Sequence, residues 1–421
     1  MELVILAGGK GTRLGRSDVP KSMVQIADKP VLEWTVEWAA RSRFSAVTVI
    51  GHHQADQIEA YFGDGSRHGV RMRYVVEHEP MGTAGAVRLL RGRVNERFMV
   101  VYGDLVCDFD AERMIAFDVA APSLGTILVH PNSHPHDSDL VEVAGSNGVI
   151  TAMHPKPHEP GRAYQNLVNA AVFILHPAIL EYIPAETPTD FGRDLFPRLV
   201  REGKQLRAYA TFEYVSDMGT RDRLLRVERD IRSGRVAARH RRHPQRAIFL
   251  DRDGVINVDA ASGRGITTPQ ELTLYDHAAA AVRAINHSEY LAIVVTNQPG
   301  LAKGFLSEAD LDAIHRRLDW ELASGGAFLD GLYYCPHHPE RGFAGEVPAL
   351  KVSCDCRKPA PGLLQRAALD FNLDLSRCWM VGDRPADMEA AQRVGAQGVL
   401  VTPGTNLETV IASIVQGGSE R

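Results

Sequence analysis

Two aspartates separated by one residue follow an apolar run in the second half of the chain: Asp251 and Asp253 come directly after Ala247–Leu250. Two carboxylates so placed, just off a buried strand, suit covalent phosphoryl transfer. One carboxylate can attack phosphorus while the other shuttles a proton, and a Mg²⁺ ion can screen both negative charges. The pattern therefore predicts an aspartate nucleophile in a phosphate-processing site.

Polar residues after later apolar runs predict the rest of this site. Thr296 and Asn297 end the next run and can hydrogen-bond a phosphate, and Lys358 supplies a cation that offsets the carboxylates. Asp383 adds an acidic group at another strand end. Asp387 has two equally good explanations: it belongs to the same acidic cluster, or it is an acid at a helix N-terminus that the helix dipole stabilises.

Three cysteines and a histidine form a C-x-H…C-x-C pattern made of Cys335, His337, Cys354 and Cys356, with sixteen residues between His337 and Cys354. Three thiolates and one imidazole complete a tetrahedral shell, the usual arrangement of structural Zn²⁺. Because no ligand position stays open, we expect the metal to pin a loop; buried free thiols are the alternative. The loop leads into Arg357–Lys358, so zinc would position these cations indirectly.

The N-terminus carries a second candidate site, in which Gly8, Gly9, Gly11 and Arg13 follow an apolar segment. Glycines let the backbone approach a polyphosphate and present N–H groups to it, while the arginine neutralises charge. The spacing fits neither the dinucleotide fingerprint nor the P-loop. Lys21 lies close behind the loop, and a second cation suits the charge of a transferring phosphoryl group.

Two aspartates complete this second candidate site. Asp104 ends an apolar run, at the edge where open parallel sheets bind ligands, and Asp217 offers another carboxylate. Two carboxylates together with nucleotide phosphates form a suitable Mg²⁺ site. A single strand-end aspartate is structural or solvated about as often as it is functional, so the prediction depends on the combination with the loop and Lys21.

Apolar strand-like runs alternate with helical patterns along the whole chain, which predicts an α/β protein built from parallel sheets. A capping-box pattern at Ser307–Asp310 predicts the start of a helix with Leu311, Ile314, Leu318 and Leu322 on one face. A helical pattern also covers Val31–Arg41. The expected strands include Leu3–Leu6, Ala46–Ile50, Phe98–Tyr102, Gly125–Val129, Ala247–Leu250, Leu291–Val295 and Trp379–Val381.

The chain divides at residues 233–246, a basic segment with almost no apolar content, which we interpret as a solvated linker between independent domains. A nucleic-acid patch is the alternative, but no aromatic residues interleave with the charges. The prediction is therefore two domains, residues 1–232 and 247–421. A length of 421 residues agrees with two or three domains.

Composition favours a cytoplasmic protein that acts on small molecules. A net charge of −5 gives no general reason to expect nucleic acid or an anionic membrane as a partner. No apolar run approaches the roughly 20 residues that span a bilayer, and the first residues look like a strand, not a signal peptide. Five cysteines, three of them clustered with a histidine, favour a metal site in a reducing compartment. Cys107, Cys378 and His338 receive no role, and the sequence leaves the oligomeric state open.

The first half resembles the nucleotide-sugar pyrophosphorylase family over roughly Met1–Ile231, through the glycine loop with Gly-Thr-Arg-Leu and the Pro-Lys pair at Pro20–Lys21. The resemblance implies a Rossmann-like nucleotidyltransferase sheet. It also implies in-line attack by a sugar 1-phosphate on the α-phosphorus of an NTP, with release of pyrophosphate. Arg13 and Lys21 would then stabilise the developing charge, and Asp104 and Asp217 would hold Mg²⁺.

The same resemblance implies substrate-binding residues. The stretch Gly82–Gly85 would pack near the base, and Lys156 and Asn169 would hold the sugar phosphate. The chain departs from the family at Pro155-Lys156-Pro157, where Glu-Lys-Pro is usual, and the missing acid often contacts a sugar hydroxyl. Analogy with hexose enzymes therefore does not identify the sugar.

The second half resembles the haloacid dehalogenase-like (HAD-like) phosphatases over roughly Ala247–Val415. The resemblance implies a Rossmannoid domain with a small zinc loop, in which Asp251 is the nucleophile and Asp253 the acid and base. Thr296, Asn297 and Lys358 would bind phosphate, and Asp383 with Asp251 and the Asp253 carbonyl would hold Mg²⁺. The cysteine loop followed by Cys-Arg-Lys-Pro narrows the resemblance to heptose 1,7-bisphosphate phosphatases, with histidinol phosphate phosphatases as close relatives. Arg357 would grip the phosphate that stays on the sugar.

Together the two resemblances imply consecutive steps toward a nucleotide-activated heptose, such as those needed for lipopolysaccharide or another surface polysaccharide. Removal of the 7-phosphate would yield a heptose 1-phosphate, which the transferase would join to a nucleotide. GTP is favoured because the glycine-loop type resembles the guanylyltransferase of GDP-heptose synthesis. Two alternatives stay open: a histidinol-phosphate-type phosphatase fused to a hexose 1-phosphate nucleotidyltransferase, and a phosphatase fused to a non-catalytic domain that senses a nucleotide sugar.

Overall fold

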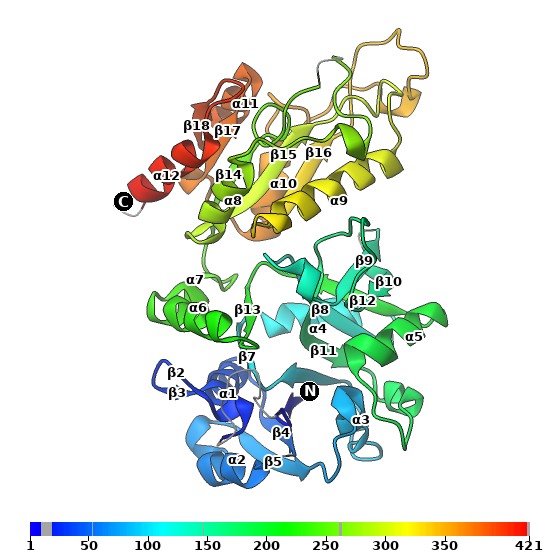
Figure 1. The fold of residues 1–421 in the computed structure, drawn as a ribbon, viewed down its shortest axis with the longest axis vertical. Helices are drawn as coiled ribbons and strands as arrows, with labels where there is room; N and C mark the ends of the chain where they lie inside the picture. Colours follow the sequence, from blue (N-terminus) through cyan, green and yellow to red (C-terminus); the bar gives the residue numbers. More distant parts are fainter. Residues whose placement is uncertain (10–18, 53, 146, 261–262, 419–421) are drawn as a thin grey trace. The chain divides into compact units, whose positions relative to one another are not determined.

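The computed structural model describes residues 1–421 except 10–18, 53, 146, 261–262 and 419–421. The predicted loop residues Gly11 and Arg13 therefore lie outside the described residues. Two compact units divide the chain. The first consists of residues 1–130, 136–158 and 167–242, and the second of residues 131–135, 159–166 and 243–421. Each is described separately (Figure 1).

The first unit is built on a mixed sheet whose nine strands, among the described residues, run in the order β5-β4-β1-β6-β11-β8-β12-β10-β9. Strands β1, β4, β5 and β6 are parallel, as are β8 and β12, whereas β11 runs antiparallel to both of its neighbours β6 and β8. The strands are β1 (Glu2–Leu6), β4 (Ala46–Gly51), β5 (Arg71–Val76), β6 (Phe98–Tyr102), β8 (Gly125–His130), β9 (Leu140–Ala144), β10 (Val149–His154), β11 (Val168–Leu175) and β12 (Leu206–Ala210).

Two small ribbons and seven α-helices complete the described part of this unit. The ribbons pair β2 (Gln25–Ile26) with β3 (Lys29–Pro30), and β7 (Leu105–Asp108) with β13 (Tyr214–Asp217). The helices are α1 (Val31–Arg41), α2 (Ala55–Phe62), α3 (Gly82–Arg88), α4 (Ala111–Val119), α5 (Phe196–Arg201), α6 (Arg221–Arg232) and α7 (Arg235–Ala238).

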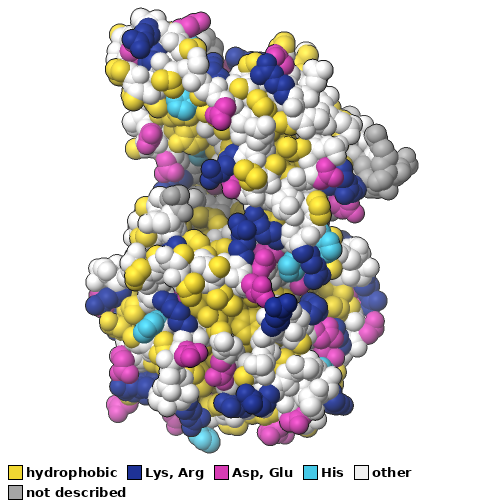
Figure 2. Space-filling view, turned by 180° about the vertical axis from the view of Figure 1, so that it is seen from behind, with side chains coloured by type: hydrophobic (Ala, Val, Ile, Leu, Met, Phe, Trp, Pro, Cys, Tyr) yellow, Lys and Arg dark blue, Asp and Glu magenta, His cyan; other side chains and the backbone are white. Residues whose placement is uncertain are grey.

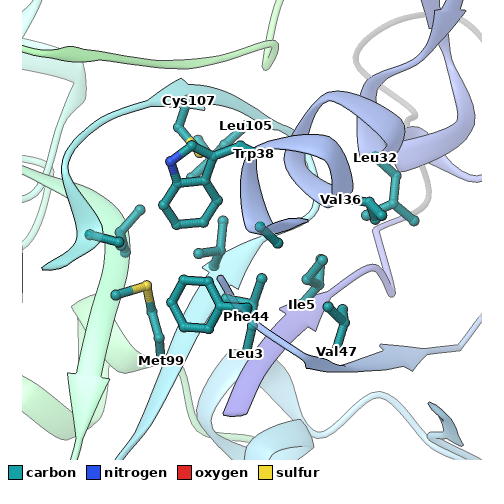
Figure 3. Close-up of a cluster of buried hydrophobic side chains, with 14 of the residues drawn as sticks. Leu3, Ile5, Leu32, Val36, Trp38, Phe44, Val47, Met99, Leu105 and Cys107 are labelled. Atoms are coloured by element: carbon teal, nitrogen blue, oxygen red, sulfur yellow. The ribbon is translucent and has the colours of Figure 1, made fainter. Parts of the chain in front are cut away.

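Apolar faces of helix and sheet meet in the core of the first unit. Figure 3 shows Leu32, Val36 and Trp38 of α1 in one buried cluster with Leu3 and Ile5 of the central strand β1. Trp38 is fully buried, and its indole N–H donates to the carbonyl of Phe109 at 3.0 Å, so the ring adds packing without leaving a polar group unpaired. Cys107 lies in the same cluster, and burial raises the pKa of its thiol, as expected of an unreactive core cysteine.

The second unit has an all-parallel sheet of five described strands in the order β16-β15-β14-β17-β18. The strands are β14 (Arg246–Leu250), β15 (Tyr290–Asn297), β16 (Gly331–Cys335), β17 (Trp379–Gly382) and β18 (Gln397–Leu400). The helices are α8 (Ala278–Asn286), α9 (Glu308–Ser324), α10 (Gly362–Phe371), α11 (Pro385–Arg393) and α12 (Leu407–Gly418). The three central strands are almost completely buried, which explains their continuous apolar sequences.

Most expected elements of the sequence are confirmed, and one expectation is corrected. The helix at residues 31–41 is present as predicted, and every expected strand is found to within one or two residues at each end. Ser307 caps α9 through the predicted reciprocal bonds with Asp310. The expectation of purely parallel sheets is wrong for the first unit, because β11 enters between β6 and β8 in the opposite direction.

The segment 233–246 is more structured than a solvated linker. It contains α7, and the side chains of Arg239 and Gln245 are buried. The compact units change over between Arg242 and His243, inside this segment. Among the described residues no helix is long and apolar enough to cross a membrane. On the face shown in Figure 2, basic and acidic side chains are interspersed.

Candidate functional sites

The carboxyl ends of β1 and β6 bring the glycine loop and Asp104 together. The amide of Gly103 donates to the carbonyl of Leu6 at 2.8 Å, and the amide of Lys21 donates to the carbonyl of Gly9 at 3.2 Å. A side chain at Gly103 would meet the Leu6 carbonyl oxygen at 2.9 Å, so only glycine permits this approach. The predicted loop residues Gly8 and Gly9 thus lie at the same sheet edge as Lys21 and Asp104.

The two predicted Mg²⁺ ligands are each paired with a cation. The ammonium of Lys21 contacts the carboxylate of Asp104. Arg223 donates to both carboxylate oxygens of Asp217 at 2.9 and 3.1 Å. Burial disfavours the charged form of Asp217, but Arg223, the amide of Gly219 and Lys21 outweigh it and lower its pKa. Sequence reasoning missed Arg223, because Asp217 ends strand β13 whereas Arg223 lies on α6, and no local pattern joins the two.

The backbone segments that carry these two carboxylates are neighbours in the small ribbon of β7 and β13. Strands β7 and β13 pair Asp217 with Leu105, the neighbour of Asp104, and the amide of Met218 donates to the Asp104 carbonyl at 3.2 Å. Oxygen ligands of this kind, next to a phosphate-binding loop, fit Mg²⁺. For Mg²⁺ to bind, Lys21 and Arg223 would have to move away from these carboxylates.

A cavity of about 340 Å³ opens beside the glycine loop, and its lining includes Gly8, Gly9, Lys21, Glu77, Gly82, Thr83, Asp104 and Asp190. Gly82 has φ +75°, and a side chain there would meet the backbone of Thr189 at 2.6 Å. Sequence reasoning missed Glu77. One of its carboxylate oxygens accepts the amide of Met81 at 2.8 Å, and the other lies 3.6 Å from the position of a Cβ at Gly8.

The predicted sugar-phosphate residues Lys156 and Asn169 both flank Asp139. The amide of Lys156 donates to the Asp139 carboxylate at 3.3 Å, and the amide of Asn169 donates to its carbonyl at 2.9 Å. The Lys156 ammonium is exposed and pairs with Asp137 at 2.8 Å. Burial raises the pKa of Asp139. Sequence reasoning missed Asp139. Its carboxylate lies beside Pro155-Lys156, where the nucleotide-sugar pyrophosphorylase family usually has Glu-Lys.

In the second unit, Lys358 connects the predicted nucleophile to a second acid. Its buried ammonium lies 3.0 Å from a carboxylate oxygen of Asp251 and 2.7 Å from one of Asp387, and it donates to the carbonyl of Val295 at 2.8 Å. Burial raises the pKa of Asp251 to about 6, and the charge of Lys358 opposes the rise. Asp387 also accepts the amide of Arg384 at 3.1 Å near the start of α11. The structure therefore supports both explanations of Asp387, as a member of the acidic cluster and as an acid at a helix N-terminus.

The predicted acid and base, Asp253, is held by three donors. Arg252, Asn257 and Gln298 each donate to its carboxylate at 3.0 Å. Burial disfavours the charge, but Arg252, Asn257 and Gln298 outweigh burial and lower the pKa of Asp253. Arg252 is completely buried. Its position between the two aspartates was a signal that sequence reasoning did not use.

Thr296 and Asn297 have different surroundings. The Thr296 hydroxyl accepts from Gln298 at 2.9 Å and lies in the same network as Asp253. The side-chain amide of Asn297 instead makes two 3.0 Å hydrogen bonds with the backbone of Lys358. The amide of Asn297 thus positions the lysine, and its contact with phosphate stays a prediction.

Three carboxylates form a potential metal site beside the nucleophile. Oxygens of Asp251, Asp383 and Asp387 lie within 4.8 Å of one another. One oxygen of Asp383 is buried and has no hydrogen-bond partner in the described part of the chain, as expected of an atom that binds a cation. Hard carboxylate oxygens fit Mg²⁺. Gly254, with φ +80°, permits this approach, because a Cβ there would meet Asp383 at 2.5 Å.

The four predicted zinc ligands converge. One donor atom from each of Cys335, His337, Cys354 and Cys356 lies within 4.8 Å of all the others. The sulfur–sulfur distances are 3.1 to 3.6 Å, and the His337 Nδ1 lies 3.2 Å from the sulfur of Cys356. Three sulfurs and one nitrogen fit a closed tetrahedral Zn²⁺ site. Arg357 donates to the His337 carbonyl at 3.3 Å, which ties the zinc loop to the neighbouring cations.

Known proteins match the two parts of the chain separately. Residues 2–234 match the nucleotidyl transferase family, and residues 355–417 match the HAD-hydrolase-like family. D-glycero-β-D-manno-heptose-1,7-bisphosphate 7-phosphatase of Salmonella typhi is 42% identical over 160 residues, which are 38% of this chain and 81% of that protein. The protein of the same name from Yersinia pestis is 41% identical over 145 residues, 34% of this chain and 73% of that protein.

Solved structures of both kinds are similar in parts. HddC from Yersinia pseudotuberculosis, also solved with GMP-PN, is 23% identical with a TM-score of 0.47, over 55% of this chain and 99% of that one. A HAD-like phosphatase from Mesorhizobium loti is 33% identical with a TM-score of 0.36, over 41% and 87%. The assignment of the two parts to families rests on the family matches and on the curated relatives. The protein is therefore a bifunctional enzyme that belongs to the nucleotidyl transferase family in its first part and to the HAD-type D-glycero-β-D-manno-heptose-1,7-bisphosphate 7-phosphatase family in its second.

Proposed function

We propose that the protein catalyses two consecutive steps of nucleotide-activated heptose synthesis. The phosphatase, in residues 247–421, removes the 7-phosphate of D-glycero-D-manno-heptose 1,7-bisphosphate. The transferase, in residues 1–232, then joins the heptose 1-phosphate to GMP from GTP and releases pyrophosphate. The observation that carries the proposal is the fusion itself: relatives of the second part act on a bisphosphate whose 7-dephosphorylation leaves a sugar 1-phosphate, the substrate class that the resemblance of the first part implies.

In the phosphatase step, a carboxylate oxygen of Asp251 attacks the 7-phosphorus, and the bond from phosphorus to the sugar oxygen breaks. Water then attacks the aspartyl phosphate and releases inorganic phosphate. Lys358, 3.0 Å from Asp251, balances charge on the nucleophile and the phosphoryl group. Asp251, Asp383 and the carbonyl of Asp253 would hold Mg²⁺, which would supply further charge stabilisation.

Asp253 serves the two halves of this step differently. Its contacts with Arg252, Asn257 and Gln298 keep it ionised, which is the state that accepts a proton from the attacking water. To protonate the departing sugar oxygen it must first gain a proton, against the charge of Arg252. These contacts support a role of Asp253 as the base in the hydrolytic half of the reaction.

In the transferase step, the sugar 1-phosphate attacks the α-phosphorus of the nucleotide, and pyrophosphate leaves. Lys21 lies at the cavity beside Gly8 and Gly9 and would stabilise the phosphoryl group, together with Arg13. Asp104 and Asp217 would hold Mg²⁺, which offsets the phosphate charge. Lys156 and Asn169 would hold the sugar phosphate, with Asp139 between them.

The preference for GTP is supported by Glu77. Its carboxylate lines the cavity, and one oxygen stays free of the Met81 amide. Guanine presents two adjacent donors, N1–H and the 2-amino group, which suit a carboxylate. The substitution Glu77→Gln places an amide donor there and is expected to lower kcat/KM for GTP about tenfold or more relative to the other NTPs, because hydrogen bonds to charged groups contribute about 1.5–3 kcal/mol. An unchanged preference among NTPs would exclude Glu77 as the group that recognises the base.

The whole proposal is tested by following phosphate and pyrophosphate release separately. The full chain receives Mg²⁺, the α- or β-anomer of the heptose bisphosphate, and each NTP in turn; histidinol phosphate is the competing substrate. We expect phosphate first and pyrophosphate only afterwards. Asp251→Asn should abolish both signals from bisphosphate but leave pyrophosphate release from added heptose 1-phosphate, whereas Asp104→Asn should abolish only pyrophosphate. Pyrophosphate release that survives Asp104→Asn, or faster turnover of histidinol phosphate, would contradict the proposal.

A further inference from the structure

Asp139 lies between the two residues predicted to hold the sugar phosphate, and backbone contacts fix it there. It directly precedes β9, whose first residue, Leu140, pairs with Val168 of β11. The Asp139 carbonyl accepts the amide of Asn169 at 2.9 Å, and Oδ1 of its carboxylate accepts the amide of Lys156 at 3.3 Å. The position of this carboxylate is therefore set by two other segments of the first unit.

The other carboxylate oxygen of Asp139, Oδ2, faces a gap beside Gly192. A Cβ at Gly192 would collide with this oxygen and would lie 3.3 Å from the side-chain nitrogen of Asn169. Gly192 does not have a positive φ, so its backbone conformation alone does not require glycine. The space beside Asp139 does require it. Within the described part of the chain, Oδ2 accepts no hydrogen bond.

The side-chain amide of Asn169 places a donor next to this free acceptor. Its oxygen accepts the amide of Ala171 at 3.0 Å, so its NH₂ group is the part that faces Gly192. A carboxylate oxygen and an NH₂ group side by side match two neighbouring sugar hydroxyls, because each hydroxyl both donates and accepts hydrogen bonds. An ionised phosphate would be repelled by the carboxylate. The gap therefore suits the hydroxyls of a sugar better than its phosphate.

The carboxylate of Asp139 lies close to the cavity beside the glycine loop. Tyr102 and Asp190 line that cavity, and the charge of Asp139 acts on both. Gly192 follows Asp190 by two residues. Burial raises the pKa of Asp139, and the amide and the charge of Lys156 oppose the rise. A partly desolvated carboxylate oxygen without a donor is unfavourable, so a bound hydroxyl would offset its cost.

We propose that Asp139 is a specificity-determining residue of the transferase. Its free carboxylate oxygen accepts a hydrogen bond from one hydroxyl of the sugar 1-phosphate, and the Asn169 amide donates to the neighbouring hydroxyl. The inference deepens the proposed function, on which it rests. Asp139 thereby supplies, next to Lys156, the acid that the chain lacks at Pro155.

The test combines one substitution with a series of altered sugars, in the full-length protein with GTP and Mg²⁺. Asp139→Asn retains an oxygen for the Lys156 amide but places an NH₂ group at the free position. It is expected to lower kcat/KM for heptose 1-phosphate about 10- to 100-fold, the usual effect of losing a charged hydrogen bond, and to change the KM for GTP by less than about threefold. Glu142→Gln, which removes a partly buried carboxylate farther along β9, is the matched control.

Monodeoxy analogues of heptose 1-phosphate, each lacking one hydroxyl, identify the contact. With the wild-type protein, one analogue should lose about the same 10- to 100-fold in kcat/KM. Asp139→Asn should use that analogue and the parent sugar about equally well, because the contact is already absent. A merely structural role would lower kcat/KM for every analogue by the same factor, and such additive losses would overturn the inference. An unchanged kcat/KM of Asp139→Asn for the parent sugar would also overturn it.

Gly192→Ala gives an independent measurement, because its Cβ fills the gap without removing a charge. It should raise the KM for heptose 1-phosphate but not the KM for GTP, and it decides the question if Asp139→Asn does not fold; an unchanged sugar KM contradicts the inference. Should the wild-type protein use no heptose 1-phosphate, the proposed function fails, and the same comparison on α-D-mannose 1-phosphate and its deoxy analogues then decides the role of Asp139. A wild-type protein that uses neither sugar, or that loses activity on no deoxy analogue, overturns it.

Discussion

Replacing Gly254 by alanine should weaken the binding of Mg²⁺ by the phosphatase site. The new Cβ would lie 2.5 Å from a carboxylate oxygen of Asp383, whereas ordinary contact begins at 3.4 Å. The Asp383 side chain must therefore retreat by about 0.9 Å, the difference between these distances. In a well-formed metal site the metal–ligand distances lie within about 0.2 Å of their usual values, so a shift of this size would disturb the site. Disturbing a residue that supports a metal ligand typically costs about 10- to 100-fold in metal affinity, which is the loss expected here.

The assay is the release of phosphate as a function of Mg²⁺ concentration, with pyrophosphate release by the first unit as an internal control. A positive φ alone costs an alanine about 1–2 kcal/mol. Gly265→Ala isolates that cost, because Gly265 has φ +77° and no atom of the described residues lies within 4 Å of its added Cβ. The reasoning is refuted if both variants need the same Mg²⁺ concentration for half-maximal rate, since Asp383 would then be free to move without loss.

Three further predictions concern the second unit. Chelation of zinc, or Cys354→Ser, should abolish phosphate release and lower the melting temperature of this unit while pyrophosphate release persists; parallel loss of both activities would contradict a local role. Ser307→Ala removes the hydroxyl that accepts the amide of Asp310, while the backbone amide of residue 307 can still donate to the Asp310 carboxylate. The change should cost about 1 kcal/mol of unfolding free energy, measured by denaturant titration against Ser324→Ala, which changes a serine at the other end of the same helix. Burial lowers the pKa of His315 to about 3, below its usual 6.5, so the unfolded chain binds the extra proton between these values. Unfolding free energy should therefore fall as pH drops below about 6.5, by up to about 1.4 kcal/mol per pH unit, and His315→Gln should flatten that slope; an unchanged slope would show that other groups cause it.

Local patterns predicted the elements well because they depend on neighbouring residues. The capping box at Ser307 and the amphipathic stretch at Val31–Arg41 each act within a few residues, and both are present. The direction of β11 was not predictable in this way. Its apolar run looks the same whether it enters a sheet parallel or antiparallel, and the partners β6 and β8 lie far away in the sequence.

The candidate sites were predictable where a residue type has few alternatives. The C-x-H…C-x-C pattern predicted a metal site, and the structure brings its four donor atoms together. Lys358 was expected to offset the charge of the carboxylates, and its ammonium contacts Asp251. Partners supplied by other elements were missed. Two examples are Arg223, which forms an ion pair with Asp217, and Phe343, whose ring contacts both Lys303 and Lys351. Both are common residue types, and their contacts depend on tertiary folding. The two hydrogen bonds between the Asn297 amide and the backbone of Lys358 were missed for the same reason.

The central position of β14 has a consequence for synthesis on the ribosome. This strand is the first of its sheet to be made, yet it needs neighbours on both sides: β15 on one and β17 on the other. The strand β15 is made within about forty residues, but β17 appears only after residue 378. One flank of this buried strand therefore stays uncovered while more than a hundred residues are translated, and such an exposed edge invites aggregation. Nascent chains that end before β17 should be the species that chaperones bind.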